Sequence, residues 1–150
     1  MIFRIIQIAV PFIWFGLIGG ISFLEAPLKF RAPNITLALG LGIGKLVFFW
    51  LNKIELFLAA LMLLSFFKAR PQARIAAYCF AVIAVLLLLE TFWLLPVLDV
   101  RASAVINGTA APYSNTHIIY IAFDAIKFVL LFTLGIIVAK SNIRIDQYET

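Results

Sequence analysis

Several charged and amide side chains lie inside hydrophobic stretches that are long enough to cross a membrane. The clearest case is the stretch 44–67, GKLVFFWLNKIELFLAALMLLSFF, which carries Lys45, Asn52, Lys53 and Glu55 in its first half. Charges at that depth in a bilayer are costly, so such residues face a bundle interior by default and are candidates for a functional site. The chemistry open to them is ion pairing, proton relay and the binding of a polar or ionic ligand.

Two further stretches place charged residues at a similar depth. Asp124 and Lys127 lie about 12–17 Å from the outer end of the stretch 116–139. Asn52, Lys53 and Glu55 lie at the same distance of about 12–17 Å from the outer end of the stretch 44–67. Glu90 lies about 8–9 Å below the end of the stretch 74–95, and Glu25 ends the first stretch. Each hydrophobic stretch therefore contributes one carboxylate, and we expect the outer half of the bundle to have a polar interior and the inner half to be dry.

We expect these groups to form an outward-facing cavity, with Glu55, Asp124 and Lys127 at its floor and His117 and Tyr120 at its mouth. The candidate ligand-binding residues are Glu55, Asp124, Lys127, Lys53, Asn52, Glu90, His117, Tyr120, Lys45, Glu25, Arg31 and Arg101.

Three interpretations of this cluster remain open. It could be a buried network of ion pairs that fixes helix register. It could be a ligand or proton site open to the outside. A metal-dependent enzyme is disfavoured, because di-metal bundles use Glu-x-x-His pairs on two helices, whereas His117 is the sole histidine and the lysines would repel a cation. We therefore predict no cofactor, no metal and no catalytic residue, and a function that is not enzymatic.

The composition places the chain in a membrane. Of its 150 residues, 65% are hydrophobic and 13% are charged, and the mean hydropathy is +1.11, far from the averages of soluble domains. The net charge is +5, but the basic residues lie between hydrophobic blocks and form no stripe, which argues against nucleic-acid binding.

The elements that must position these residues are four membrane-spanning helices, at about 2–24, 44–67, 74–95 and 116–139, in a single all-α four-helix bundle. Pro27 and Pro33 argue that the connection 25–43 is not helical, with TLALGLGIG as a surface loop or a re-entrant segment. The glycines in this segment favour loop flexibility or close packing. The stretch 97–115 is expected to be a linker rich in turns, including one at Asn107-Gly108.

The first helix carries two patterns. Gln7, Trp14, Ser22 and Glu25 fall on one side, which we expect to face the bundle. Gly16 and Gly20 form a small-xxx-small pair of the kind that allows close helix contact.

The distribution of positive charge predicts the orientation. Four spans put both termini on one side, and the more basic side of a membrane protein is the cytoplasmic one. That side carries Arg4, Lys68, Arg70, Arg74, Lys140 and Arg144, against Lys29, Arg31 and Arg101 on the other. We therefore expect both termini in the cytoplasm and the chain in the inner (plasma) membrane.

The order of features resembles the small four-helix membrane family typified by transmembrane protein 205. The matching residues are Phe30-Arg31 at the end of the first span, Glu90, Pro96 and Arg101 around the end of the third, and His117 and Asp124 in the fourth. The linkers are shorter here, and Asp124 stands where the family would have an amide. The resemblance implies a four-span bundle and a role in export or resistance, and it supplies no catalytic residues.

Our main hypothesis is a protein that binds a small polar or ionic ligand, with proton-coupled transport as one form of it. The alternative is a non-catalytic accessory or assembly subunit of a membrane complex. Because four helices rarely enclose a full transport path, we expect contact with membrane lipid and a homo-oligomer or a partner membrane subunit.

Overall fold

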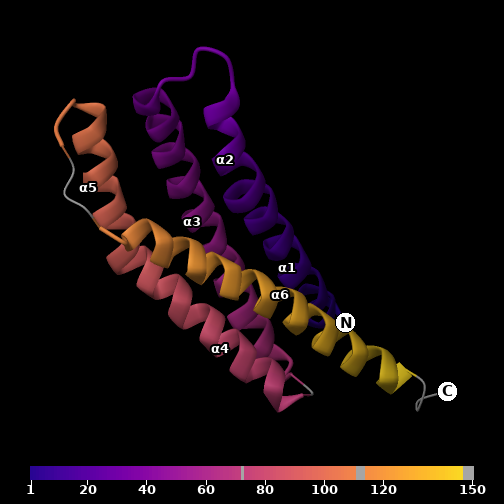
Figure 1. Ribbon diagram of the computed structural model, residues 1–150. Helices are drawn as coiled ribbons and strands as arrows, with labels where there is room; N and C mark the ends of the chain where they lie inside the picture. The colour runs from indigo at the N-terminus through magenta and orange to yellow at the C-terminus, as the bar shows by residue number, and fades with distance from the viewer. Residues whose placement is uncertain (72, 111–113, 147–150) are drawn as a thin grey trace.

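The chain folds into long helices, and no strand occurs in residues 1–71, 73–110 and 114–146, which are the residues that this computed structural model describes, with side chains as far as 142 (Figure 1). Four helices are long and apolar enough to cross a membrane: Ile2–Arg31, Leu37–Lys68, Arg74–Ile106 and Thr116–Asn142. This confirms the expected all-helical architecture with four candidate membrane helices.

The first and third of these helices each contain a π-helical segment. The first comprises α1 (Ile2–Ile18), a π-helical segment (Gly19–Glu25), α2 (Ala26–Leu28) and a short 3₁₀ turn (Lys29–Arg31). The second is α3 (Leu37–Lys68), the third comprises α4 (Arg74–Leu89), a π-helical segment (Glu90–Leu94) and α5 (Leu95–Ile106), and the fourth is α6 (Thr116–Asp146).

The helices continue through two prolines at which we expected the first and third spans to end. Pro27 and Pro96 each stand at the start of a resumed α-helix, directly after a π-helical segment. A proline ring clashes with the carbonyl four residues earlier, here that of Phe23 or Phe92, and both of these residues lie within the wider π turns. The prediction that the segments after residues 24 and 95 are not helical is therefore wrong as far as Arg31 and Ile106.

The glycine-rich segment before residue 44 is also helical, which corrects the expected loop or re-entrant segment. Thr36 accepts a hydrogen bond from the backbone nitrogen of Leu39 at 3.2 Å and caps the start of α3. A Cβ on Gly40 would lie 2.2 Å from the ring of Phe30, and one on Gly44 would lie 3.2 Å from Nζ of Lys29. Close packing against the end of the first helix, and not loop flexibility, explains these two glycines.

The Gly16 and Gly20 pair does not make the close helix contact that we expected. No heavy atom lies within 4 Å of a Cβ built on either residue, whereas one built on the neighbouring Gly19 would lie 3.0 Å from the Phe128 ring. Of these three glycines, only Gly19 therefore packs closely against α6.

The half of the bundle that holds the N-terminus and the turn between α3 and α4, which we expected to be the inner half, has an apolar core. Its core joins all four helices through buried residues such as Ile18, Met62, Ile83 and Leu134. Gln7 closes this end of the bundle, because its amide nitrogen donates to the carbonyls of Ser65 at 3.1 Å and Ala69 at 2.6 Å near the end of α3.

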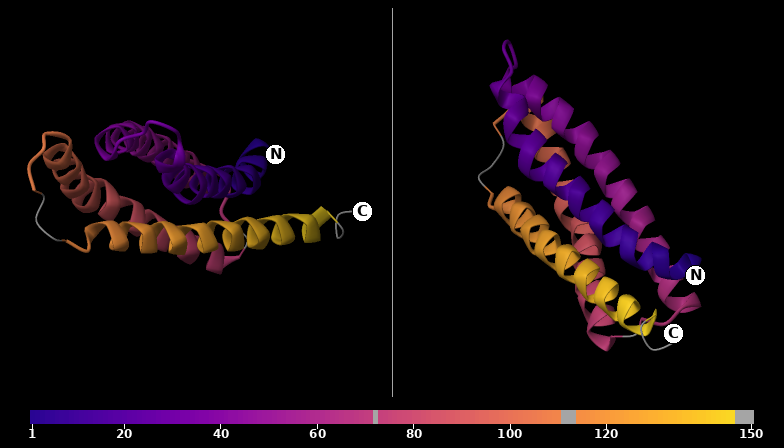
Figure 2. Two further views of the ribbon diagram at one scale, coloured as in Figure 1. Left: turned by 45° about the horizontal axis from the view of Figure 1, so that its top comes forward. Right: turned by 90° about the vertical axis from the view of Figure 1, so that its right-hand side faces the viewer.

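The opposite half of the molecule is less closed. The first helix, α3 and α5 reach one end of the molecule, whereas α6 begins part-way along its neighbours and runs beside α1 and α4 (Figures 1 and 2). The turn at Asn107-Gly108, with Gly108 at φ +73°, reverses the chain after α5 and confirms the predicted turn. Beyond the start of α6, three helices therefore form the walls of the bundle.

The contact between α1 and α6 depends on Gly135, and replacing this glycine tests the fold. A Cβ at Gly135 would lie 2.7 Å from the Phe12 ring, whereas one at Gly42 meets nothing within 4 Å. We expect Gly135→Ala to destabilise the protein by about 1–3 kcal/mol through overpacking, more than the roughly 1 kcal/mol gained in helix propensity. Gly42→Ala should be neutral or stabilising. Thermal unfolding in detergent measures both, and equal unfolding midpoints for the two variants would contradict this packing.

Candidate functional site

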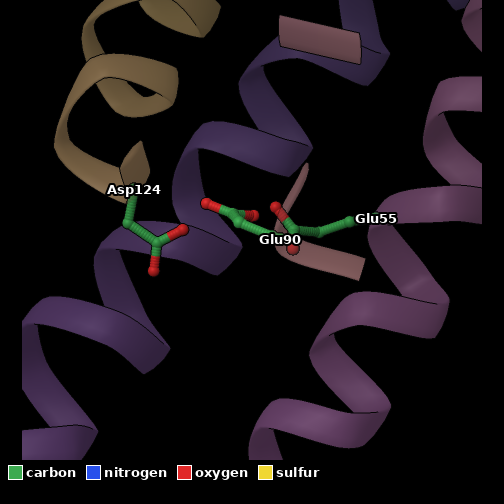
Figure 3. Close-up of side chains that lie close together, drawn as sticks. All are labelled: Glu55, Glu90 and Asp124. Atoms are coloured by element: carbon green, nitrogen blue, oxygen red, sulfur yellow. The ribbon is translucent and has the colours of Figure 1, made fainter. Parts of the chain in front are cut away.

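Three carboxyl groups from different helices point toward one another in the interior of the bundle (Figure 3). Glu55 comes from α3, Glu90 from the first position of the second π-helical segment, and Asp124 from α6. Lys127 lies one turn after Asp124, on the same face of α6. All four side chains are fully buried, with 0% of each residue exposed.

The ammonium group of Lys127 contacts all three carboxylates. Its Nζ donates to Oε1 of Glu55 at 2.8 Å and to Oε2 of Glu90, and it lies 3.0 Å from Oδ1 of Asp124. The indole nitrogen of Trp14 on α1 donates to the same Oε1 of Glu55 at 2.8 Å. These five residues, which we call the charged cluster, join all four helices.

The charged cluster is not fully satisfied internally. Oε2 of Glu55, Oε1 of Glu90 and Oδ2 of Asp124 are buried, and none has a hydrogen-bond partner among the described residues. Three carboxylates share one lysine, so the formal charge is three negative and one positive, or −2, when all four groups are ionised. Buried polar atoms without partners are uncommon and mark a site as strained or functional.

A cavity of about 890 Å³ lies beside the charged cluster, at the level of the first turns of α6. Its walls are mostly apolar and aromatic, and they come from the end of the first helix, α3, α5 and the start of α6. Asp124 lines the cavity and belongs to the charged cluster, so it connects the two. The volume is within the range of small-molecule sites.

Ion pairs hold the cavity walls in place. Lys45 on α3 lies 3.0 Å from Oδ1 of Asp99 and donates to the Ser103 hydroxyl at 2.7 Å, both on α5. Lys29 lies 3.3 Å from Oε2 of Glu25, one turn earlier in the same helix. The Lys29 ammonium also lies 5.3 Å from the centroid of the Phe48 ring, across the gap to α3.

The remaining predicted residues divide between wall and surface. Asn52 donates to the Thr91 hydroxyl at 2.9 Å, and the buried Tyr120 ring packs edge-on against Phe48. The cavity lining also includes Lys53, His117 and Arg101. Of these, Lys53 and His117 are exposed. Arg31 is exposed at the end of the first helix and is not part of the lining.

The geometry differs from the sequence expectation in two ways. Glu25 does not join the other carboxylates, because the first helix contributes Trp14 to the charged cluster instead. Glu55 and Lys127 do not line the cavity, and among the residues of the charged cluster only Asp124 does. Of the three residues predicted at the cavity floor, Asp124 alone belongs to the lining, and both residues predicted at the mouth, His117 and Tyr120, belong to it as well.

Sequence reasoning missed four partners of these residues. They are Trp14 beside Glu55, Thr91 beside Asn52, and Asp99 and Ser103 beside Lys45. The sequence did indicate that Trp14 faces the bundle, because it lies on the same side of its helix as Gln7. The sequence did not indicate the pairing of Asp99 with Lys45, because Asp99 was assigned to a linker and not to a helix.

The three carboxylates could in principle hold a metal ion. One oxygen from each of Glu55, Glu90 and Asp124 lies within 4.8 Å of the others. The Lys127 ammonium, however, already contacts all three and would repel a cation placed between them. Histidine, the usual ligand of transition metals, is not part of this group among the described residues. The donor set therefore fits an ammonium better than a metal.

Comparison with protein-family models, with curated proteins and with solved structures found no match, so the function of this site has to be argued from its own geometry.

Removing the lysine tests whether its charge holds the cluster together. We expect Lys127→Met to destabilise the protein by about 3–5 kcal/mol, because it leaves buried carboxylates without their cation. Combining it with Glu55→Gln, Glu90→Gln and Asp124→Asn removes the repulsion and should recover most of this loss. Thermal unfolding in detergent measures the difference, with Lys140→Met, an exposed lysine of the same helix, as the control. An unfolding midpoint for Lys127→Met close to that of the parent would show that the ion pairs carry little of the stability.

Proposed function

We propose that this chain is an integral membrane protein that binds a small polar or ionic ligand in the cavity and exchanges protons at the charged cluster beneath it. In this proposal the chain crosses the inner (plasma) membrane four times, with both termini in the cytoplasm and the cavity open to the outside. The resulting activity is proton-coupled movement of the ligand.

The observation that carries the proposal is the position of Asp124. This residue lines the cavity and its carboxylate lies 3.0 Å from the Lys127 ammonium, so a bound ligand would be one side chain away from Glu55 and Glu90. A charge that arrives at Asp124 changes the electrostatic balance of the whole cluster. Ligand binding and proton binding would then be linked, and by linkage each would affect the other equally.

The formal charge of the cluster supports proton exchange. Two uncompensated negative charges are costly in a buried site, and a proton shared among the carboxylates reduces that cost. Trp14 and Lys127 both donate to the same oxygen of Glu55, which leaves the other carboxylate oxygens as the places for protons.

The basic residues support the proposed orientation. Arg4 donates to the Arg70 carbonyl at 3.0 Å, so the N-terminus and the turn between α3 and α4 lie at the same end. Lys68 and Arg74 flank this turn, and α6 ends on the same side (Figure 1). An excess of Lys and Arg marks the cytoplasmic side. Arg144, which we counted on this side, lies outside the described side chains.

The apolar outer faces of the helices support contact with lipid or with another membrane chain. Large side chains such as Trp50, Phe57 and Phe92 are more than half exposed. Because four helices rarely enclose a full transport path, we propose a homo-oligomer or a partner subunit as the working unit. An export role, as the resemblance to the transmembrane protein 205 family implies, is compatible with this arrangement.

The second candidate is an accessory or assembly subunit in which the charges serve only to fasten the helices. The contact of Lys127 with three carboxylates, and of Trp14 with one of them, favours it, because these bonds tie all four helices at one level. The two candidates differ in what the loss of one carboxylate does.

Topology is tested with alkaline phosphatase, which is active only outside the cytoplasm. We expect a fusion at the C-terminus to be inactive and an insertion in the turn at Asn107-Gly108 to be active, because the end of α6 at Asp146 and this turn lie at opposite ends of the bundle. An active C-terminal fusion would reverse the orientation and open the cavity to the cytoplasm.

Asp124→Asn separates the two functions. In proteoliposomes that contain a trapped pH dye, we expect at least one class among added carboxylates, phosphates, amines and amino acids to drive proton movement. Asp124→Asn should abolish this movement. It should leave the thermal unfolding midpoint close to that of the parent, because Lys127 keeps Glu55 and Glu90 as partners and the formal charge of the cluster falls from −2 to −1. If the variant instead loses stability and no solute moves protons with the parent protein, the accessory-subunit function is supported and the binding function is rejected.

A further inference from the structure

We infer that the outward face of α3 docks a transmembrane helix of a different protein, one that places an aspartate or a glutamate opposite Lys53. The inference rests on the membrane insertion that we propose above, and it specifies the partner subunit proposed there. Its basis is a lysine at the middle of α3 that points away from the bundle and has no anionic partner in the described part of the chain.

Lys53 and Glu55 lie on opposite sides of α3. Two residues along an α-helix are separated by about 200°, so Glu55 enters the charged cluster whereas Lys53 is exposed. The Lys53 ammonium lies 5.2 Å from the centroid of the Phe49 ring, and it forms no ion pair or hydrogen bond with the described residues. The N–H donors of this ammonium therefore lack an acceptor within that part of the chain.

The position of Lys53 along α3 keeps it away from lipid headgroups. The helix runs from Leu37 to Lys68, and Lys53 lies about 24 Å from its first residue and about 23 Å from its last. In a membrane centred on this helix, the hydrocarbon core of about 30 Å leaves Lys53 about 15 Å from either surface, further than a lysine extends. A side chain on a neighbouring helix can reach it at this depth.

The described carboxylates of this chain are either buried or too far along the helix to pair with Lys53. There are five of them, Glu25, Glu55, Glu90, Asp99 and Asp124. The three in the charged cluster are fully buried and already contact Lys127. Asp99 pairs with Lys45, about 12 Å along α3 from Lys53. Glu25 pairs with Lys29, which lies against residue 44, about 14 Å along α3 from Lys53. The cavity, which Lys53 also lines, therefore offers it no free carboxylate from these five.

A second copy of the chain does not supply the missing carboxylate either. Copies in the same orientation, related by a symmetry axis along the membrane normal, keep each residue at its own height. At the height of Lys53 the described carboxylates are those of the charged cluster, which are fully buried in every copy. The acidic residue opposite Lys53 therefore comes from a different chain.

The rest of this face of α3 suits a helix. Its exposed residues recur every three or four positions, the spacing with which two helices pack side by side. They include Leu46, Trp50, Lys53, Phe57, Ala60 and Leu64. Trp50 and Phe57 lie about one turn to either side of Lys53 and are 62% and 61% exposed. A helix docked here would cover these rings and enclose the ion pair in an apolar contact, where the attraction is stronger than in water.

A synthetic leucine helix with one glutamate at its centre tests the inference, because the glutamate has the same depth in either orientation of the peptide. The full chain carries a donor fluorophore and the peptide an acceptor, and energy transfer in phosphatidylcholine vesicles gives the Kd. We expect the glutamate peptide to bind about 10-fold more tightly than the matched glutamine peptide. Lys53→Met should remove this difference, and Lys53→Arg should keep it.

Two variants and a stability measurement serve as controls. Lys68→Met removes an exposed lysine at the end of the same helix and should leave the Kd unchanged. Ala102→Trp fills the cavity and should also leave it unchanged, because the peptide docks on the outward face of α3. The thermal unfolding midpoint of Lys53→Met should equal or exceed that of the parent, since no bond within the bundle is lost. A lower midpoint would place the ammonium inside the bundle and overturn the inference.

Disulfide formation locates the docked peptide. Phe57 and Val129 are both exposed, and each lies two residues beyond the contact of Glu55 with Lys127, so they are at a similar level. In a Cys79→Ser background, a peptide cysteine one turn from the glutamate should crosslink to Phe57→Cys under oxidation. Crosslinking to Val129→Cys with equal efficiency would overturn the assignment of the face.

The outcomes separate this inference from the proposed cavity function. Equal binding of the glutamate and glutamine peptides to the parent would overturn the inference and leave the cavity function standing, because proton movement is measured without a peptide. Binding that depends on Lys53, in a chain that moves no protons with any solute, would keep the docking face and reject the cavity function. Self-association of the parent chain that Lys53→Met abolishes would identify the partner as a second copy and overturn the inference.

Discussion

The ammonium group of Lys127 holds together three buried carboxylates that would otherwise repel one another. Their oxygens lie within 4.8 Å of each other, and at an effective dielectric constant near 20 each ionised pair costs about 3–4 kcal/mol. The lysine offsets this repulsion because it contacts Glu55, Glu90 and Asp124 together. The cost of burying the Lys127 ammonium is offset by the same three contacts. The packing of α3, α4 and α6 at this level therefore depends on one side chain.

The two π-helical segments determine which residues reach this level. Each contains the residue four positions before a proline, and the wider turn lets the helix continue past the proline ring. A π-helical segment also rotates the later turns of its helix relative to a regular α-helix, and Glu90 stands at the beginning of one. The same feature that lengthens the third helix therefore lies at the point where that helix provides its carboxylate.

Hydrophobic periodicity and the cost of buried charge were good guides to the fold and to the members of the cluster. Four long apolar stretches gave four helices, and the cost of burying a charge in an apolar helix brought Glu55, Glu90, Asp124 and Lys127 together. Helix ends were predicted poorly, because Pro27 and Pro96 were taken as terminators when a local π turn could accommodate them. The glycines at 40 and 44 were ambiguous for a related reason, because only the tertiary structure shows that the end of the first helix packs on them.

The residues that belong to the charged cluster were easier to predict than the contacts that each of these residues makes. A charged residue in an apolar helix can be recognised from the sequence. For Trp14, helical periodicity predicted that the side chain faces the bundle, but it did not predict that the indole nitrogen donates to Glu55. Likewise, the pairing of Lys45 with Asp99 depends on α5 continuing beyond Pro96, so an error in the helix end concealed the contact.

The two halves of the bundle differ in how much energy opposes their movement. Breaking the buried ion pairs of the charged cluster costs several kcal/mol, whereas a partly exposed pair such as Lys45 with Asp99 contributes about 1 kcal/mol or less. Beyond the cluster, the first helix and α3 meet through the ring and lysine that rest on Gly40 and Gly44, and α6 is absent from that end. Any rearrangement of low cost would therefore move the helix ends around the cavity and leave the charged cluster assembled. In the orientation that we propose, access to the cavity would be controlled from the end of the bundle that holds the turn at Asn107-Gly108.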